Sequence, residues 1–445
     1  MNGPVLRRPL IRGTVERLHR SLFEFIAVPA LIVAGFVVLA EVIDWLDNHA
    51  GPQHRWSPLR TWLAQYVGDT QSAIGVLTAV AGSLFTVTSI TFSILLLAVQ
   101  QGATVLNSQI VDHYLRRASN RAWFGFFVGI SLFALITLVQ TTHTRAPVFG
   151  VMMSTLLGAL ALFAMIVLIY GTIDQMRPAT LIQAIVTTAM TARAKQLPLL
   201  AVSRPTGDAP QGTIVPSAHN GHFSHADLIL LRNLLSGDGR LSITICPAIG
   251  DFVAAGAPLA IIDGGDEATA DAVARAIILT QHRDIGHDAG YSVHHLHTIG
   301  WTATSTARSD PAVSAIAIHA WHHLMIVWAP APIRADADAR LFYEDRLPLQ
   351  LIDMIESLMV ASSESRQHQT MALLLDTLAA VLPILPPTCL CWAADTLQTA
   401  ARLVGSHDHT RVLAQALHNA AAACRRYGLN DVSQALTTAA RQAVP

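Results

Sequence analysis

No charged residue occurs between Ala73 and Gln101, a stretch longer than the roughly 20 residues with which a helix crosses about 30 Å of hydrocarbon. This stretch therefore predicts a transmembrane helix. At about 100° per residue, its small and hydroxylated residues fall on one face, and Leu and Ile cover the remaining arc, which suits lipid. We call the first face the polar stripe, and it comprises Gly75, Thr78, Gly82, Thr86, Ser89, Ser93 and Gln100.

The polar stripe has two interpretations. Small and hydroxylated side chains let neighbouring helices approach closely and hydrogen-bond to one another, so the stripe is a candidate helix-packing face. The same side chains can line a path for a solute, so the stripe is also a candidate pore wall. Both interpretations place this helix at the centre of a membrane bundle.

Apolar residues are concentrated in the first part of the chain. They make up 52% of the sequence and charged residues only 13%, and these values lie outside the range of ordinary soluble domains. Nearly all of the excess falls before Thr172, where apolar runs predict four spans, at residues 22–45, 73–101, 122–142 and 147–173. The sequence thus predicts a basic arm at residues 1–20 and a four-span membrane domain at residues 21–175.

Basic residues are unevenly distributed between the two sides of these spans. Eleven flank the spans on the side of the N-terminal arm, and three lie on the other side. Because cytoplasmic loops carry the excess of Arg and Lys, we expect both termini in the cytoplasm and the protein in the bacterial inner membrane. The acidic residues at the far end of the first span, Asp44 and Asp47, are expected to reach interfacial water.

The remainder of the chain has mixed polarity and predicts a cytoplasmic α+β domain. Residues 176–212 are expected to form a helical stalk and then a linker, because three prolines and two glycines follow Leu197. Apolar residues separated by Pro and Gly predict a small β barrel or sandwich at residues 213–266. From residue 267 to 445 the periodicity is helical, with helices expected at residues 268–282, 291–306, 311–327 and 347–363 and Ala-rich helices to 444.

Histidines cluster in the second half of the chain. His319 with His322 or His323 has the spacing at which two imidazoles on a helix bind zinc, and Asp288 or Asp310 would complete such a site. No paired-Cys or HExxH pattern accompanies them, so hydrogen-bonding histidines on the surface or between helices are the simpler interpretation. Such histidines can also titrate near neutral pH and sense protons. We therefore predict no metal and no cofactor, and these five residues are the weak candidates for a metal site.

Other short motifs have structural explanations. Asp310 followed by Pro311 is a typical helix start, because Asp is a good N-cap and Pro suits the first helical position. Gly250-Asp251 and Gly256-Ala257-Pro258 predict tight turns between strands. The sequence shows no phosphate-binding glycine loop, nucleophile elbow or basic cluster, so it indicates no catalytic residue and no nucleic-acid partner, and it leaves an enzymatic activity unsupported. The cysteines lack zinc-type spacing and suit a reducing cytoplasm; they are Cys246, Cys389, Cys391 and Cys424.

Several stretches occur in an order that resembles a known family. They are TVTSITFSILLLAVQQ in the second span, LNSQIVDHYLRRASNRAWFGFFVG after it, GDFVAAGAPLA at Gly250 to Ala260, and the series Asp288, Tyr291, Leu296 and Ser309-Asp310-Pro311. These stretches resemble the bacterial predicted membrane proteins grouped as a domain of unknown function, number two-two-five-four. The resemblance runs from the first span to about Glu364. It implies the topology and the domain order, and it supplies no activity.

Two functions fit these features. The first is an oligomeric channel or transporter, in which second spans surround a polar path and the cytoplasmic domain acts as gate or regulator. Four spans are few for a pore in one chain, so this function requires a homo-oligomer. The second is a membrane-anchored regulatory or scaffolding protein, whose spans only hold it in the lipid bilayer. The sequence identifies no transported solute.

Overall fold

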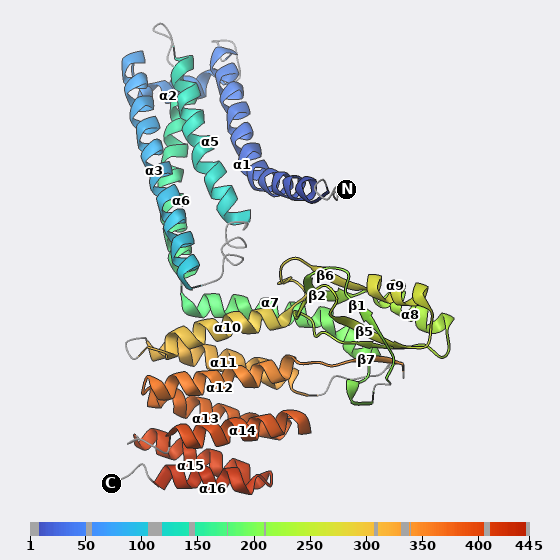
Figure 1. The fold of residues 1–445 in the computed structure, drawn as a ribbon. Helices are drawn as coiled ribbons and strands as arrows, with labels where there is room; N and C mark the ends of the chain where they lie inside the picture. The colour runs from blue at the N-terminus through green and yellow to red at the C-terminus, as the bar shows by residue number, and fades with distance from the viewer. Residues whose placement is uncertain are drawn as a thin grey trace, which may run out of the picture. The chain divides into compact units, whose positions relative to one another are not determined.

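The chain divides into two compact units, Met1–Arg177 and Pro178–Pro445. The fold is known from a computed structural model, which describes residues 9–49, 56–105, 118–141, 147–175, 177–208, 211–306, 310–330, 338, 340–404 and 410–441 (Figure 1). Parts of the sequence predictions lie outside these residues, among them the first residues of the basic arm, Arg116 and Arg117, the loop at 142–146, Ser309 and the end of the Ala-rich region.

The first unit is a bundle of long apolar helices, and it confirms the four predicted spans. The helices are α1 (Pro9–His49), α2 (Ser57–Val67), α3 (Thr70–Val105), α5 (Ala118–Gln140) and α6 (Val148–Gln175). All except α2 are long and apolar enough to cross a membrane, within Ile26–His49, Thr70–Ile94, Arg121–Gln140 and Val148–Asp174. Helix α2 lies between the first two spans in sequence, and its Trp62 and Tyr66 rings pack edge to face.

Helices α5 and α6 form the centre of this bundle, because each packs against α1 and α3 and against the other. The expectation that the second span is central was therefore wrong. The close approach of α1 depends on glycines of α5: a Cβ atom at Gly125 would lie 2.8 Å from Cα of Pro29, and one at Gly129 would collide with Phe36. Small residues thus do bring helices together in this bundle. These two lie on α5, and Gly150 of α6 likewise lies against Thr137 of α5.

The second unit begins with α7 (Pro178–Val202), which packs against two later helices, α10 (Ala289–Thr304) and α11 (Pro311–Trp328). Its buried residues include Ile182, Ala189 and Leu199. The predicted helix is therefore present, and it packs within the helical core of its own unit; the linker expected from Pro198 was wrong at its start, since α7 continues to Val202. Beyond it, Arg204 forms a bridge to Phe342, and a short 3-10 helix follows at Thr206–Asp208.

Two small sheets form the β part of the second unit. One has the order β1 (Thr213–Pro216), β5 (Pro258–Asp263), β3 (Ser242–Ile245), β7 (Leu341–Tyr343), and the other the order β4 (Phe252–Val253), β2 (Gly221–Ala226), β6 (Ile277–Thr280). All pairings are antiparallel except that of β3 with β7. Helices α8 (Leu228–Gly237) and α9 (Glu267–Ala276) add Leu231, Leu235 and Val273 to the shared apolar core.

Two of these strands fall where only helices were expected. The predicted helix at 268–282 ends at Ala276 and gives way to β6, whose sequence IILT has the β-branched residues that favour a strand. Strand β7 lies still further along the chain, after α11. The β part therefore extends beyond the predicted boundary at residue 266.

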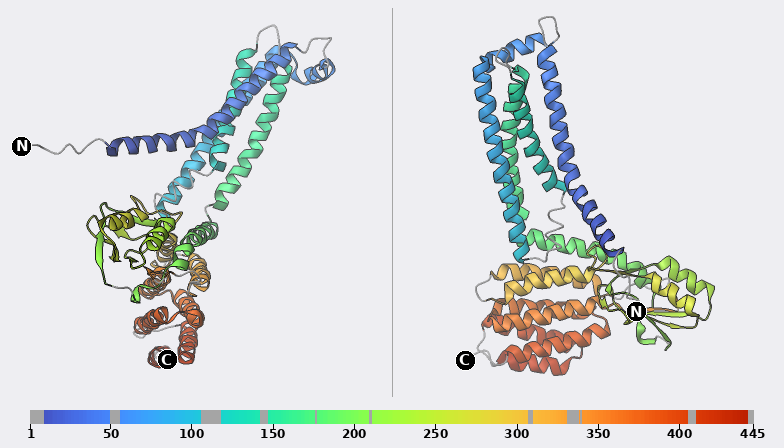
Figure 2. Two further views of the ribbon diagram at one scale, coloured as in Figure 1. Left: turned by 90° about the vertical axis from the view of Figure 1, so that its right-hand side faces the viewer. Right: turned by 45° about the horizontal axis from the view of Figure 1, so that its top comes forward.

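The rest of the second unit consists of helices in two rows (Figures 1 and 2). Helices that alternate along the chain belong to the same row, and neighbours within a row pack against each other. One row contains α10, α12 (Leu347–Glu364), α14 (Pro387–Val404) and α16 (Asn430–Arg441); the other contains α11, α13 (His368–Val381) and α15 (Arg411–Arg426). The short 3-10 helix Leu382–Ile384 precedes α14. This confirms the predicted fold class of four apolar spans followed by a mixed helical and small-sheet region.

Candidate functional site

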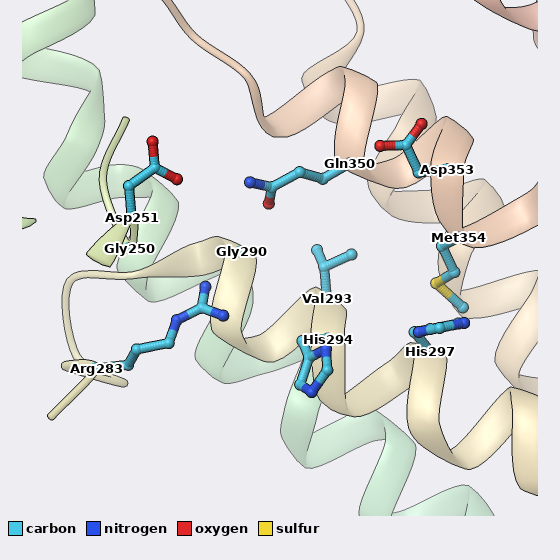
Figure 3. Close-up of a pocket in the computed structure, with 10 residues that line it drawn as sticks. All are labelled: Gly250, Asp251, Arg283, Gly290, Val293, His294, His297, Gln350, Asp353 and Met354. Carbon is cyan, nitrogen blue, oxygen red and sulfur yellow. The ribbon is translucent and has the colours of Figure 1, made fainter. Parts of the chain in front are cut away.

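A cavity of about 270 Å³ lies in the second unit, where the turn between β3 and β4 meets α10 and α12 (Figure 3). We call it the Arg283 cavity. Ten residues line it: Gly250, Asp251, Arg283, Gly290, Val293, His294, His297, Gln350, Asp353 and Met354. They come from three separate stretches of the chain, so the cavity exists only when the β part and the helices are packed together.

The guanidinium of Arg283 is held in place by two buried groups. Its Nε donates a hydrogen bond to Asp288 Oδ2 at 2.6 Å, and its Cζ lies 4.9 Å from the centre of the Tyr291 ring. Asp288 is 1% exposed and also accepts a hydrogen bond from Tyr291 N at 3.0 Å, which caps the start of α10. Burial raises the pKa of Asp288, and the ion pair with Arg283 opposes that shift.

Two glycines make room for this arrangement. Gly250 has a φ of +97°, and a Cβ atom there would lie 2.5 Å from Asp288 Oδ2 and 2.8 Å from Arg283 Nη2. A Cβ atom at Gly290 would lie 2.5 Å from Gln350 Oε1. Any other residue at Gly250 would therefore both strain the backbone and push against the ion pair. The predicted tight turn at Gly250-Asp251 is present, and it forms one wall of the cavity.

Carboxylates and imidazoles form the remaining polar walls. Asp251 Oδ2 accepts hydrogen bonds from Ala248 N at 2.9 Å and from Arg346 Nη1 at 3.1 Å. Asp353 has no hydrogen bond or ion pair with any residue that the structure describes, and burial followed by repulsion from Glu356 raises its pKa.

The two imidazoles of the cavity come from consecutive turns of α10. Burial is the main cause that lowers the pKa of both His294 and His297, and the positive charge of Arg283 adds to it at His294. Nε2 of His297 lies 2.7 Å from Ser357 Oγ, so a hydrogen bond fixes this ring. Both imidazoles are therefore neutral near pH 7, and the cationic group of the cavity is Arg283.

The structure does not bring the candidate metal ligands together. Asp288 caps α10, and Asp310 caps α11 by accepting a hydrogen bond from Ala312 N at 2.9 Å, which confirms its predicted capping role. His319 and His323 are exposed on α11, and His322 is half-buried between them. Within the described parts of the chain, no group of three or more His, Cys, Asp or Glu has the geometry of a metal site.

The polar stripe lies on the outside of the first unit. All seven of its residues are exposed, and the hydroxyls of Thr86 and Ser93 donate to the carbonyls of Gly82 and Ser89 in their own helix. The opposite face of α3 is buried against α5 and α6, with Leu77, Ala81, Leu84 and Val87 in the cores of the bundle. The expectation that the Leu-rich arc faces lipid was therefore wrong for these residues.

Sequence reasoning missed Arg283 and Gln350 of the cavity. Neither belongs to a motif, and their partners lie on other elements of the fold. A signal was available, however, because Gly250-Asp251 and the Asp288…Tyr291 pair were among the stretches on which the family resemblance rests. These stretches meet at the Arg283 cavity.

Four helices long and apolar enough to cross a membrane, followed by a mixed helical and small-sheet unit with a polar cavity that opens to solvent, are the features of a membrane protein. The chain belongs to the family described as predicted membrane proteins, DUF2254, whose model matches residues 23–379. The match includes every residue of the Arg283 cavity, whereas α14, α15 and α16 lie beyond it. No curated protein and no solved structure matches the chain.

Proposed function

We propose that this membrane protein is a membrane-anchored regulatory protein whose second unit binds a small polar ligand in the Arg283 cavity. The observation that carries the proposal is the fixed guanidinium of Arg283, which lines a cavity next to two glycines. Concave sites with a few fixed polar groups are the usual form of small-molecule sites. Because Asp288 and Tyr291 already fix the Arg283 side chain, it loses little conformational entropy when a ligand binds.

The first unit supports a role as an anchor. Its interior is filled by apolar side chains, among them Leu84, Phe127 and Phe133. The buried hydroxyls of Ser131 and Thr137 are satisfied by carbonyls of their own helix. Such a bundle is stable in lipid without a solute path through one chain.

An oligomeric channel or transporter is a second candidate, and the exposed polar stripe favours it. Seven small or polar residues face outward from an apolar helix, where they would face a second copy of the chain in a homo-oligomer. The stripe would then line a shared path, and Ser89→Leu should abolish solute flux in vesicles while leaving the oligomer intact. Loss of the oligomer on native gels would instead indicate that the stripe is a packing face between copies.

The location and orientation are also part of the proposal. The bias of basic residues supports an inner-membrane protein with both termini and the second unit in the cytoplasm. Cys391 is free and exposed, whereas Cys389 and Cys424 are buried. A membrane-impermeant maleimide should therefore leave Cys391 unlabelled in intact spheroplasts and label it after lysis. Labelling before lysis would overturn the orientation.

The regulatory function is tested with the purified full-length protein in detergent. A panel of small polar metabolites is screened for compounds that raise the unfolding temperature, with Arg283→Gln as the cavity variant and the exposed Arg232→Gln on α8 as its matched control. We expect at least one compound to stabilise the wild type and the Arg232 variant but not the Arg283 variant. The channel would be favoured by two results together: no compound stabilises the protein, and vesicles that contain it show a solute flux that Arg283→Gln does not change.

A further inference from the structure

The size of the Arg283 cavity limits what it can hold. Its volume of about 270 Å³ lies just below the range of typical ligand pockets, which begins at about 300 Å³. A monomeric metabolite of amino-acid size fits within such a volume, whereas a nucleotide or a peptide would extend out of the cavity into solvent.

The Arg283 side of the cavity is suited to a monoanion. Nε of Arg283 is taken by Asp288, and among the described residues neither Nη atom has a hydrogen-bonded partner, so this edge can form the paired hydrogen bonds that a carboxylate accepts. Among the described residues the cavity is lined by no second cation. Of the two carboxylates at this end, Asp288 is ion-paired with Arg283, and Asp251 with Arg346, which does not line the cavity. These carboxylates would repel the double charge of a phosphate more strongly than the single charge of a carboxylate.

The Asp353 side is suited to a cation. Asp353 lines the solvent-exposed edge of the cavity from α12, one turn after Gln350, and no described residue pairs with its carboxylate. Partial burial raises the pKa of Asp353, and the charge of another acid, Glu356, raises it further. In Figure 3, Arg283 and Asp353 lie on opposite sides of the view with Gln350 between them. The cavity thus has opposite charges at separate places.

The part between the two charges is neutral. His294 and His297 offer uncharged hydrogen-bonding nitrogens, and Val293 and Met354 add apolar surface. We propose that the Arg283 cavity binds a small zwitterion of the amino-acid type, with its carboxylate on Arg283 and its ammonium near Asp353. This inference rests on the proposed ligand-binding function and specifies the ligand class of the same cavity.

The test uses the full-length protein in detergent and the twenty protein amino acids as probes. The amino acid that most raises the unfolding temperature is compared by calorimetry with its carboxamide, which lacks the carboxylate, and with its N-acetyl derivative, which lacks the ammonium. Each derivative is expected to bind about tenfold or more weakly, the effect of losing about 1.4 kcal/mol of a charged hydrogen bond.

Variants assign the two ends of the ligand. Arg283→Lys should weaken binding of the amino acid about tenfold, because Lys cannot form the paired hydrogen bonds. Asp353→Asn should erase the difference between the amino acid and its N-acetyl derivative, and the exposed Asp395→Asn on α14 should preserve that difference.

The outcomes separate this inference from the proposed function. Equal binding of the amino acid and either derivative would overturn the zwitterion. Binding of only a phosphate or an uncharged sugar, still lost in Arg283→Gln, would overturn the zwitterion and leave the ligand-binding function standing. A wild-type protein that no compound of either panel stabilises would overturn both.

Discussion

The carboxylate of Asp47 in α1 accepts a hydrogen bond from the backbone nitrogen of Gly150 in α6, with Oδ2 and N 2.9 Å apart. Its other oxygen accepts from Phe149 N at 3.1 Å, and the residue is 2% exposed. The sequence-based expectation that Asp47 reaches interfacial water was thus wrong. Instead, a carboxylate of one helix caps the N-terminus of another, where backbone N–H groups and the helix dipole favour negative charge.

Replacement of Asp47 should therefore loosen the bundle. Asp47→Ala is expected to lower the free energy of unfolding by about 1–2 kcal/mol, the usual value of an N-cap, and Asp47→Asn by less, because the amide oxygen still accepts a hydrogen bond. The matched control is Asp44→Ala, since the hydrogen bond that Asp44 accepts comes from Asn48 in the same helix. Denaturation of the full-length protein in mixed micelles measures the difference, and equal stability of the Asp44 and Asp47 variants would contradict the capping role.

The two turn glycines Gly250 and Gly256 form a matched pair. Their φ angles are +97° and +84°, but a Cβ atom at Gly256 would meet nothing within 4 Å, whereas one at Gly250 would press on Asp288 and Arg283. Gly256→Ala should cost about 1–2 kcal/mol through backbone strain alone. Gly250→Ala should cost about 1.5–3 kcal/mol more, because it also disturbs a buried charged hydrogen bond. Equal unfolding temperatures of the two variants would show that the ion pair tolerates the methyl group.

His295 should make the stability of the second unit depend on pH. The residue is 3% exposed, and burial first, then His294 and Arg283, lower its pKa from 6.5 to about 4. Because the folded-state pKa is depressed, the unfolded chain binds more protons between pH 6.5 and 4. Stability is therefore fully present above pH 6.5 and is lost as the pH falls towards 4, by up to about 3 kcal/mol.

The check is the pH dependence of unfolding in a variant without this group. His295→Phe keeps a ring against Tyr291, whose centre lies 4.4 Å from that of His295, and it should show a shallower loss of stability between pH 7 and 4.5. The exposed His319→Phe should keep the wild-type slope. An unchanged slope in His295→Phe would assign the acid sensitivity to other groups.

The two faces of α3 should respond differently to the same side chain. Ala81→Leu places a larger group in the core shared with α5 and α6, and overpacking of this kind costs about 1–3 kcal/mol. Ser89→Leu adds an apolar side chain on the exposed face, and it should change the stability of the single chain by less than about 0.5 kcal/mol. Unfolding in detergent under monomeric conditions provides the measurement. A Ser89 variant as unstable as the Ala81 variant would mean that the exposed face has a partner.

Chelation should leave the second unit folded. The carboxylates of Asp288 and Asp310 are used to cap α10 and α11 and so are held away from the exposed imidazoles of His319 and His323. We expect the same unfolding temperature with and without EDTA. Stoichiometric zinc in the purified protein, lost in a His319→Ala, His322→Ala double variant, would restore the metal interpretation.

Local signals in the sequence predicted local structure well. Long apolar runs gave the four spans, since lipid leaves few alternatives to a helix, and the Asp310-Pro311 pair marked the start of α11. The linker prediction failed at Pro198 because α7 continues through it, and Ile182 and Ala189 are buried in this helix, which packs on α10 and α11 much later in the chain. Periodicity shows that a helix has an apolar face, but it does not show which element covers that face.

The cavity could not be predicted from local sequence patterns for the same reason. Arg283, Gln350 and Asp353 are ordinary polar residues in sequence, and only the packing of α10 against α12 and the β3–β4 turn places them around one space. The capping motif at Asp288 showed a helix start, but it gave no sign that the same carboxylate also holds a guanidinium.

The parallel pairing of β3 with β7 also sets a condition on how the protein is made. Ile243 pairs with Leu341 and Ile245 with Tyr343, and α9, α10 and α11 lie between the two strands in sequence. During translation, the edge of β3 therefore stays open until the ribosome has passed α11. Contacts so distant in sequence form slowly, and unpaired strand edges associate with other chains. We expect nascent chains that stall or terminate between α9 and β7 to aggregate at the membrane.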